Sequence, residues 1–233
     1  GSKPEPQRGN NGVRRNRWPP AAATDKGKPG MNAAKRIALF ERLQAANPAP
    51  TTELEYATPF QLLIAVILSA QATDKSVNLA TRTLFADAPT PQAILALGEE
   101  RLAACINRIG LYRTKAKNVI ATCRLLLERH DGRVPSEMED LLALPGVGRK
   151  TANLVRNLGF GLPGICVDTH VHRISNRMGW VTTRTPEHTE TALMAVLPQR
   201  YWIGVNELLV RYGQAVCRPL SPRCSACPAL RYC

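Results

Sequence analysis

Between residue 31 and the C-terminus, apolar runs follow helix-start signals, and no stretch alternates apolar and polar residues as a strand does. The clearest start is Thr58-Pro59-Phe60-Gln61, where an N-cap threonine, a proline and a glutamine precede an apolar run over residues 62–68. Thr90-Pro91 and Thr185-Pro186 give similar starts. We count roughly ten helices with short connections, which predicts an all-α fold.

Two of these predicted helices flank a glycine-containing turn. The first is expected to open at Ser136, because Ser136 and Glu139 have the spacing of a capping box, and to run to about residue 142. The second is expected over residues 149–158, with Gly159 and Gly161 ending it. The pattern therefore predicts a helix–hairpin–helix, which we place at residues 137–158.

The turn itself, residues 144–150, carries chemistry. Gly146 and Gly148 can adopt positive φ and have no Cβ, so the turn can press its backbone N–H groups against a phosphate. Lys150 ends the turn eighteen positions before Asp168. Lys150 could be one more phosphate contact, and Asp168 could be the N-cap of a helix that starts near residue 169. A lysine beside a phosphate grip also suggests covalent chemistry on a nucleic-acid backbone, and Asp168 favours that second interpretation.

Four of the seven cysteines crowd the last seventeen residues, at a spacing that could close a tetrahedral or cubane site. Structural zinc is the alternative, but zinc prefers two close-set pairs and this segment has one. Arginines border these cysteines, which suggests a bound cluster that holds a basic loop against phosphates. The four candidate ligands are Cys217, Cys224, Cys227 and Cys233.

The charge of the chain points to a polyanionic partner. The 233 residues carry a formal charge of +13, and the apolar fraction of 44% supports a packed core. Seven basic and two acidic residues give residues 1–30 a charge of +5 and leave +8 on the rest. Residues 1–30 are rich in proline and lack apolar periodicity, so we interpret them as a flexible basic leader. The longest apolar run is too short to cross a bilayer, and no secretion signal is evident, which predicts a protein of the cytoplasm with no membrane partner.

Together these features resemble the endonuclease III family of DNA glycosylases, in the helix-hairpin-helix superfamily. The resemblance covers about residues 31–233 and includes four motifs besides the cysteines. Those motifs are residues 68–74 (LSAQATD), 109–112 (IGLY), 144–153 (LPGVGRKTAN) and 167–170 (VDTH).

The resemblance implies two helical domains with a DNA-binding cleft between them. One would be a six-helix barrel over residues 52–162, and the other would join residues 31–51 with 163–233 and hold a [4Fe–4S] cluster. The partner would be double-stranded DNA with a damaged base or an abasic site, bound by a monomer. The compartment would be the bacterial cytoplasm, with the nucleoid, or the nucleus or mitochondrion in a eukaryote.

The same resemblance implies the chemistry. Lys150 would attack C1′ of the damaged nucleotide, expel the base and leave a Schiff base, after which β-elimination nicks the strand. Asp168 would take up a proton or stabilise the cationic sugar. Oxidised pyrimidines would be the substrates. Gln71 and Leu111 match residues that fill the vacated space in the duplex. The remaining expected DNA contacts are Gly146, Val147, Gly148, Arg149, Thr151, His170 and Arg223.

Two other functions remain open at this point. A monofunctional adenine glycosylase of the same superfamily shares the cysteine spacing, but such enzymes usually place serine where Lys150 stands and carry a further C-terminal domain. A non-catalytic DNA-binding module would use the hairpin and the cluster only to grip the backbone, but a buried carboxylate such as Asp168 adds nothing to a phosphate grip. The segment between Cys217 and Cys224 is also less basic than in some relatives, which weakens the expected phosphate contact there.

Overall fold

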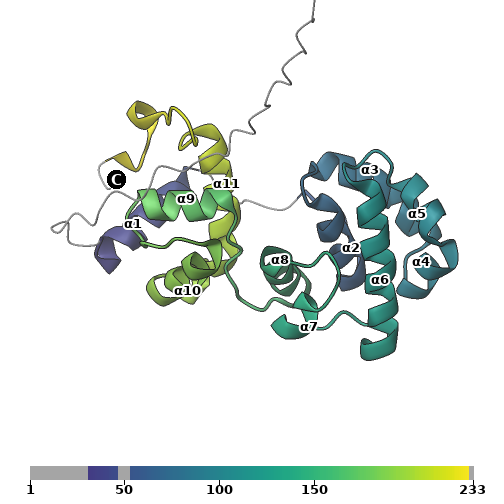
Figure 1. Ribbon diagram of the computed structural model, residues 1–233. Coiled ribbons are helices and arrows are strands. Elements are labelled where there is room, and N and C mark those ends of the chain that lie inside the picture. The colour runs from purple at the N-terminus through teal and green to yellow at the C-terminus, as the bar shows by residue number, and fades with distance from the viewer. Residues whose placement is uncertain (1–30, 47–52, 231–233) are drawn as a thin grey trace, which may run out of the picture. The chain divides into compact units, whose positions relative to one another are not determined.

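In the computed structural model, residues 31–46 and 53–230 are described, and within these ranges the fold is entirely helical, as predicted (Figure 1). The leader 1–30, residues 47–52 and Cys233 lie outside the described residues. The helices are α1 (Ala33–Ala45), α2 (Pro59–Ser69), α3 (Asp74–Asp87), α4 (Pro91–Leu97), α5 (Glu99–Cys105), α6 (Tyr112–His130), α7 (Met138–Leu142), α8 (Arg149–Phe160), α9 (Thr169–Arg177), α10 (Pro186–Val196) and α11 (Trp202–Ala215), with 3₁₀ turns η1 (Gln199–Tyr201) and η2 (Cys224–Ala226). No helix in the described ranges is both long enough and apolar enough to cross a lipid bilayer.

The first hydrophobic core is built by helices α2 to α8. The apolar run predicted from the sequence forms α2, and its side chains from Leu62 to Leu68 are all buried, as expected for a helix that is apolar on every side. α2 packs against α3, α6 and α8, while α4 and α5 lie along α6 (Figure 1). The hairpin helices α7 and α8 are therefore anchored in this core through α2.

The second core combines α1 with the C-terminal helices. Leu39, Phe40 and Leu43 of α1 pack with buried side chains of α9, α10 and α11. The rings of Phe40 and Tyr201 lie 4.5 Å apart between centroids. A segment near residue 40 thus shares a core with residues 165–229, although all of α2 to α8 lies between them in the sequence.

The three threonine–proline starts are confirmed as N-caps. The hydroxyl oxygens of Thr58, Thr90 and Thr185 each accept a hydrogen bond from the backbone N–H three residues later. These bonds satisfy one of the open N–H groups in each first turn.

Two predicted helix boundaries are wrong. Helix α7 has Glu137 as its N-cap instead of Ser136, because the Ser136 carbonyl accepts from Arg156 Nε at 3.0 Å and its hydroxyl donates to Glu137. Helix α8 continues through Gly159 and ends at Phe160, with Gly161 as a left-handed C-cap. Gly159 has a packing role instead, since a Cβ there would lie 3.3 Å from Leu62 and 3.7 Å from Pro59 of α2.

Candidate active site

Lys150 lies in the first turn of α8, directly after the hairpin, and its side chain is 50% exposed. Its Nζ lies 3.4 Å from Asp168 Oδ2. Both residues line a cavity of about 650 Å³, together with His170, Glu190 and Gln214. The fold therefore brings the two predicted catalytic side chains to one solvent-accessible cavity.

Asp168 is the N-cap of α9, which was the alternative role expected for it. Its Oδ1 accepts hydrogen bonds from the backbone N–H groups of His170 and Val171, both at 2.9 Å. The other oxygen, Oδ2, is the one that faces Lys150. The cap thus fixes the carboxylate in place and leaves one oxygen for chemistry, so the structural and the catalytic role are compatible.

The hairpin has one glycine in the left-handed region. Gly146 has φ +81°, and a Cβ there would lie 2.9 Å from the side chain of Asn118, so this position requires glycine. Gly148 has φ −93°, so of the two hairpin glycines Gly146 alone uses the positive φ that both can adopt. Gly148 is the N-cap of α8 without a side-chain cap, which leaves the first-turn N–H groups of α8 for a phosphate.

Other expected hairpin contacts have different surroundings. Val147 is buried and its N–H donates to the Leu144 carbonyl at 3.1 Å, so its side chain supports the turn from inside. Thr151 is partly buried in the same first turn of α8 as Lys150.

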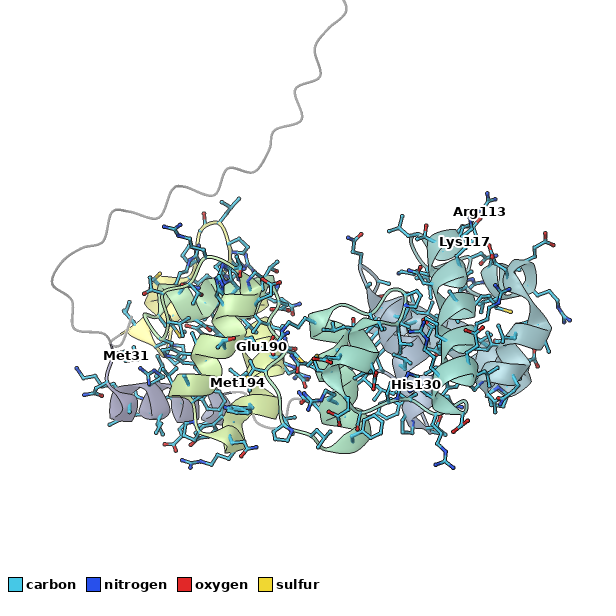
Figure 2. All side chains as sticks on the ribbon, turned by 60° about the horizontal axis from the view of Figure 1, so that its bottom comes forward. Met31, Arg113, Lys117, His130, Glu190 and Met194 are labelled. Carbon is cyan, nitrogen blue, oxygen red and sulfur yellow. The ribbon has the colours of Figure 1, made fainter. Side chains whose placement is uncertain are left out.

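Arg149 is bound by a carboxylate that the sequence did not reveal. Its Nε and Nη2 donate to Glu190 Oε2 and Oε1 at 2.7 and 3.3 Å, and these hydrogen bonds to the carboxylate raise the pKa of Arg149 (Glu190 is labelled in Figure 2). Glu190 is buried in α10 and also accepts from Asn153 Nδ2 at 3.0 Å. Asn153 in turn donates to the Ile165 carbonyl. This network ties α8, which carries Lys150, to α10 and to the segment before Asp168.

Gln71 and Leu111, which are expected to fill the space left by an extruded nucleotide, share an unusual backbone conformation. Gln71 has φ +56° and Leu111 has φ +59°, which few residues other than glycine adopt. Both residues are exposed, Leu111 to 65%. An apolar side chain held out into solvent by a strained backbone suits insertion between bases.

Arg173 of α9 contacts both His170, in the same helix, and the start of the cysteine segment. The Nδ1 of His170 is 3.1 Å from Arg173 Nη2, and burial, with further contributions from Arg173 and Lys150, lowers the pKa of His170. Arg173 also donates to the Cys217 carbonyl at 2.9 Å. Arg177 donates to the carbonyls of residues 218 and 219. The start of the cysteine segment is thus fastened to the helix that Asp168 caps.

The donor chemistry of this segment fits a metal–sulfur cluster. Cys217, Cys224 and Cys227 are free thiols, and Cys227 Sγ accepts a hydrogen bond from the backbone N–H of Ala229 at 3.3 Å. Such N–H donors stabilise thiolate ligands of iron–sulfur clusters. Within the described residues, no three His, Cys, Asp or Glu side chains are grouped closely enough to hold a metal ion. Arg223 is exposed beside Cys224, where it could reach a phosphate.

Comparisons with known proteins agree with this geometry. The profile of the HhH-GPD superfamily of base excision DNA repair proteins matches residues 64–199. Endonuclease III of Haemophilus influenzae is 51% identical over 197 residues, which are 84% of this chain and 93% of the relative. Endonuclease III of Escherichia coli is 50% identical over 197 residues, which are again 84% of this chain and 93% of the relative.

A solved structure of a trapped endonuclease III–DNA covalent intermediate superposes with a TM-score of 0.81 at 39% identity, covering 87% of this chain and 96% of that one. A non-covalent endonuclease III–DNA complex gives a TM-score of 0.80 at 40% identity. On these grounds the chain belongs to the endonuclease III family, within the HhH-GPD superfamily of base excision DNA repair proteins.

Proposed function

We propose that this protein is a bifunctional DNA glycosylase and abasic-site lyase that removes oxidised pyrimidines from duplex DNA through a Schiff base at Lys150. The observation that carries the proposal is the approach of Lys150 Nζ to within 3.4 Å of Asp168 Oδ2 at an open cavity, in a chain of the endonuclease III family. Relatives solved as covalent and non-covalent complexes with DNA support DNA as the partner.

The reaction assigned to these residues runs in two stages. Lys150 Nζ forms a bond to C1′ while the glycosidic bond to the damaged base breaks, and Asp168 stabilises the positive charge that develops on the sugar. One amine proton passes to the departing base and the other passes to O4′ as the sugar ring opens, which leaves an imine between Lys150 Nζ and C1′. Removal of a proton from C2′ expels the 3′ phosphate and nicks the strand, and water releases the lysine. The half-exposed position of Lys150 gives a flipped nucleotide direct access to its amine.

DNA contacts are proposed for the hairpin and two neighbouring loops. The uncapped first turn of α8, entered from Gly146 and Gly148, would receive a backbone phosphate. Gln71 and Leu111 would occupy the space that the extruded nucleotide leaves. The other proposed contacts are Val147, Arg149, Thr151, His170 and Arg223.

Arg149 has a structural role besides the proposed phosphate contact. Its guanidinium is already paired with the buried carboxylate of Glu190, so its main effect is to fix α8 against α10. A phosphate would meet the exposed part of the guanidinium only.

A [4Fe–4S] cluster is proposed at Cys217, Cys224, Cys227 and Cys233, supported by the four-thiol donor set and by the N–H bond to Cys227 Sγ. Bound there, the cluster would stabilise the loop that carries Arg223. We also propose that the two cores mark two domains, at residues 52–162 and at 31–51 with 163–233, since the buried side chains divide along those limits. We expect the enzyme to act as a monomer in the compartment that holds the genome, which in a bacterium is the cytoplasm.

A panel of duplexes with single lesions tests the proposal. The enzyme should release thymine glycol and nick the strand without alkali treatment, and it should leave undamaged duplexes intact. A monofunctional adenine glycosylase would instead release adenine from a mismatch and leave the strand whole. A non-catalytic module would bind all duplexes and alter none.

A further inference from the structure

Lys115 is a buried lysine of α6, in the part of the fold built around the first hydrophobic core. The proposed reaction does not use it. The residue is only 5% exposed, although it lies near the start of α6. Its Nζ donates to the carbonyls of Leu68 and Ala70 at 2.8 and 2.7 Å, and within the described residues it forms no ion pair. Burial lowers the pKa of Lys115. A buried ammonium without a carboxylate is costly, so its two carbonyl contacts must offset that cost.

These carbonyls belong to the end of α2 and to the loop that follows it. The C-terminal carbonyls of a helix lack partners within the helix and carry partial negative charge, so a cation is stabilised there. Ala70 is the C-cap of α2, and the next residue is Gln71, whose φ is +56°. The ammonium of Lys115 therefore fixes the backbone immediately before Gln71.

The main chain of Lys115 bonds to Leu111, the other exposed residue that is expected to enter the duplex. The Lys115 N–H donates to the Leu111 carbonyl at 3.0 Å, which closes the first turn of α6 on Leu111 as its N-cap. Leu111 has φ +59°. Non-glycine residues keep such conformations only where neighbouring contacts enforce them. One residue thus contacts the backbone of both loops, through its side chain toward Gln71 and through its N–H toward Leu111.

We propose that Lys115 is a positioning residue that holds Gln71 and Leu111 in register, so that both can enter the duplex when a nucleotide is extruded. The inference rests on the proposed glycosylase function and on the gap-filling role assigned there to these two residues. Lys115 is buried, so it would act through the geometry of the two loops and not through a contact of its own with DNA.

A purely structural lysine would affect every step alike, whereas a positioning residue affects extrusion most. Excision begins with a stacked and paired nucleotide, whose extrusion must be compensated by filling the gap. A preformed abasic site has no base to unstack and is extruded at less cost. Loss of the two Lys115 Nζ contacts to the end of α2 should therefore slow base excision more than it slows β-elimination at an abasic site.

The test compares K115M, which keeps the apolar stem and removes the ammonium, with K117M. Lys117 is exposed on the same helix and is labelled in Figure 2, so K117M removes one cation from α6 without touching α2. Single-turnover rates are measured on a thymine glycol duplex and on a duplex with a preformed abasic site. Fluorescence of 2-aminopurine beside an uncleavable abasic analogue reports extrusion directly. K115R restores donors, and K115Q is a neutral second variant that can still reach one carbonyl.

We expect K115M to slow excision by roughly tenfold or more and elimination by less than about threefold, since small displacements of positioning groups have effects of this size. The 2-aminopurine signal should fall in K115M, recover in part in K115R and be unchanged in K117M. Combining K115M with L111A should slow excision little more than the slower single variant does, because both act on one step.

Several outcomes would overturn the inference. Equal slowing of excision and elimination in K115M, or an equal effect of K117M, would show that Lys115 has no specific role in extrusion. Failure of both K115M and K115Q to unfold cooperatively would make Lys115 a residue of the fold alone. Absence of excision and of elimination in the wild-type protein would instead refute the proposed function, and the two failures are therefore distinguishable.

Discussion

Replacing Asp168 with asparagine should separate its two roles. The capping oxygen Oδ1 accepts from two backbone N–H groups, and an asparagine oxygen can accept both, so α9 keeps its cap. The cap then directs the amide nitrogen toward Lys150 Nζ, where Oδ2 now lies at 3.4 Å. D168N thus replaces an attractive charge at the reaction centre with a donor group, while the helix start is preserved.

The expected effect of D168N on stability is much smaller than its expected effect on the rate of excision. The Lys150–Asp168 pair is partly solvated, with side chains 50% and 14% exposed, so its loss should cost stability about 1 kcal/mol or less. Removal of a positioned charge that stabilises a cationic transition state should slow excision roughly a hundredfold, about 2.7 kcal/mol. D168A also loses both capping bonds, which should cost about 1–2 kcal/mol more and lower Tm by roughly 2–8 °C relative to D168N.

Single-turnover excision and thermal melting of wild type, D168N and D168A measure these differences. We expect D168N to melt near wild type with a large rate loss, and D168A to show the same rate loss with a lower Tm. Excision by D168N near the wild-type rate would refute the assigned charge role. A Tm of D168N as low as that of D168A would refute the separation of cap from catalysis.

Three further predictions concern the cluster, salt and pH. The purified protein should be yellow-brown, with a broad visible absorption band and about four irons, and a colourless protein with one zinc would contradict the cluster assigned to residues 217–233. The logarithm of DNA affinity should fall with log salt at about −0.9 per phosphate contacted, and deletion of residues 1–30 should flatten this slope only modestly, because +8 remains. Burial lowers the pKa of His172 below its ordinary 6.5 in spite of Glu187, so the unfolded chain binds protons first and stability should fall as pH drops below 6.5. H172N should weaken the loss of stability at low pH. If Tm depended on pH in the same way in H172N and wild type, the contribution assigned to His172 would be wrong.

Local signals predicted the fold well because they act within a few residues. The threonine caps, the proline at the first helical position and the left-handed Gly146 depend on neighbouring backbone atoms, so a sequence pattern is enough to locate them. The all-α class followed from these signals. Boundary errors arose where tertiary packing dominates. Gly159 lies inside α8, where α2 passes close enough to favour a residue without a Cβ, and that approach leaves no mark in the local sequence.

The candidate site shows the same contrast between features set by local sequence and features set by tertiary packing. Lys150 and Asp168 were chosen for their spacing and motifs, and their side chains meet at one cavity, while their catalytic roles stay predictions. Glu190 and Lys115 were missed. Glu190 meets Arg149 across 41 residues, and Lys115 meets Leu68 across 47. Contacts at such separations depend on how whole helices pack, and a charged residue that will be buried looks like any solvated one in the sequence.

Trapping of the covalent intermediate tests the central claim most directly. Borohydride reduces the imine at C1′, so wild-type protein incubated with lesion DNA should yield a stable protein–DNA adduct whose modified peptide contains Lys150. K150Q should give neither adduct nor nicking, yet bind DNA with a loss of about 1 kcal/mol or less, since one exposed phosphate contact contributes little. An adduct mapped to another lysine, or nicking by K150Q near the wild-type rate, would contradict the covalent role assigned to Lys150.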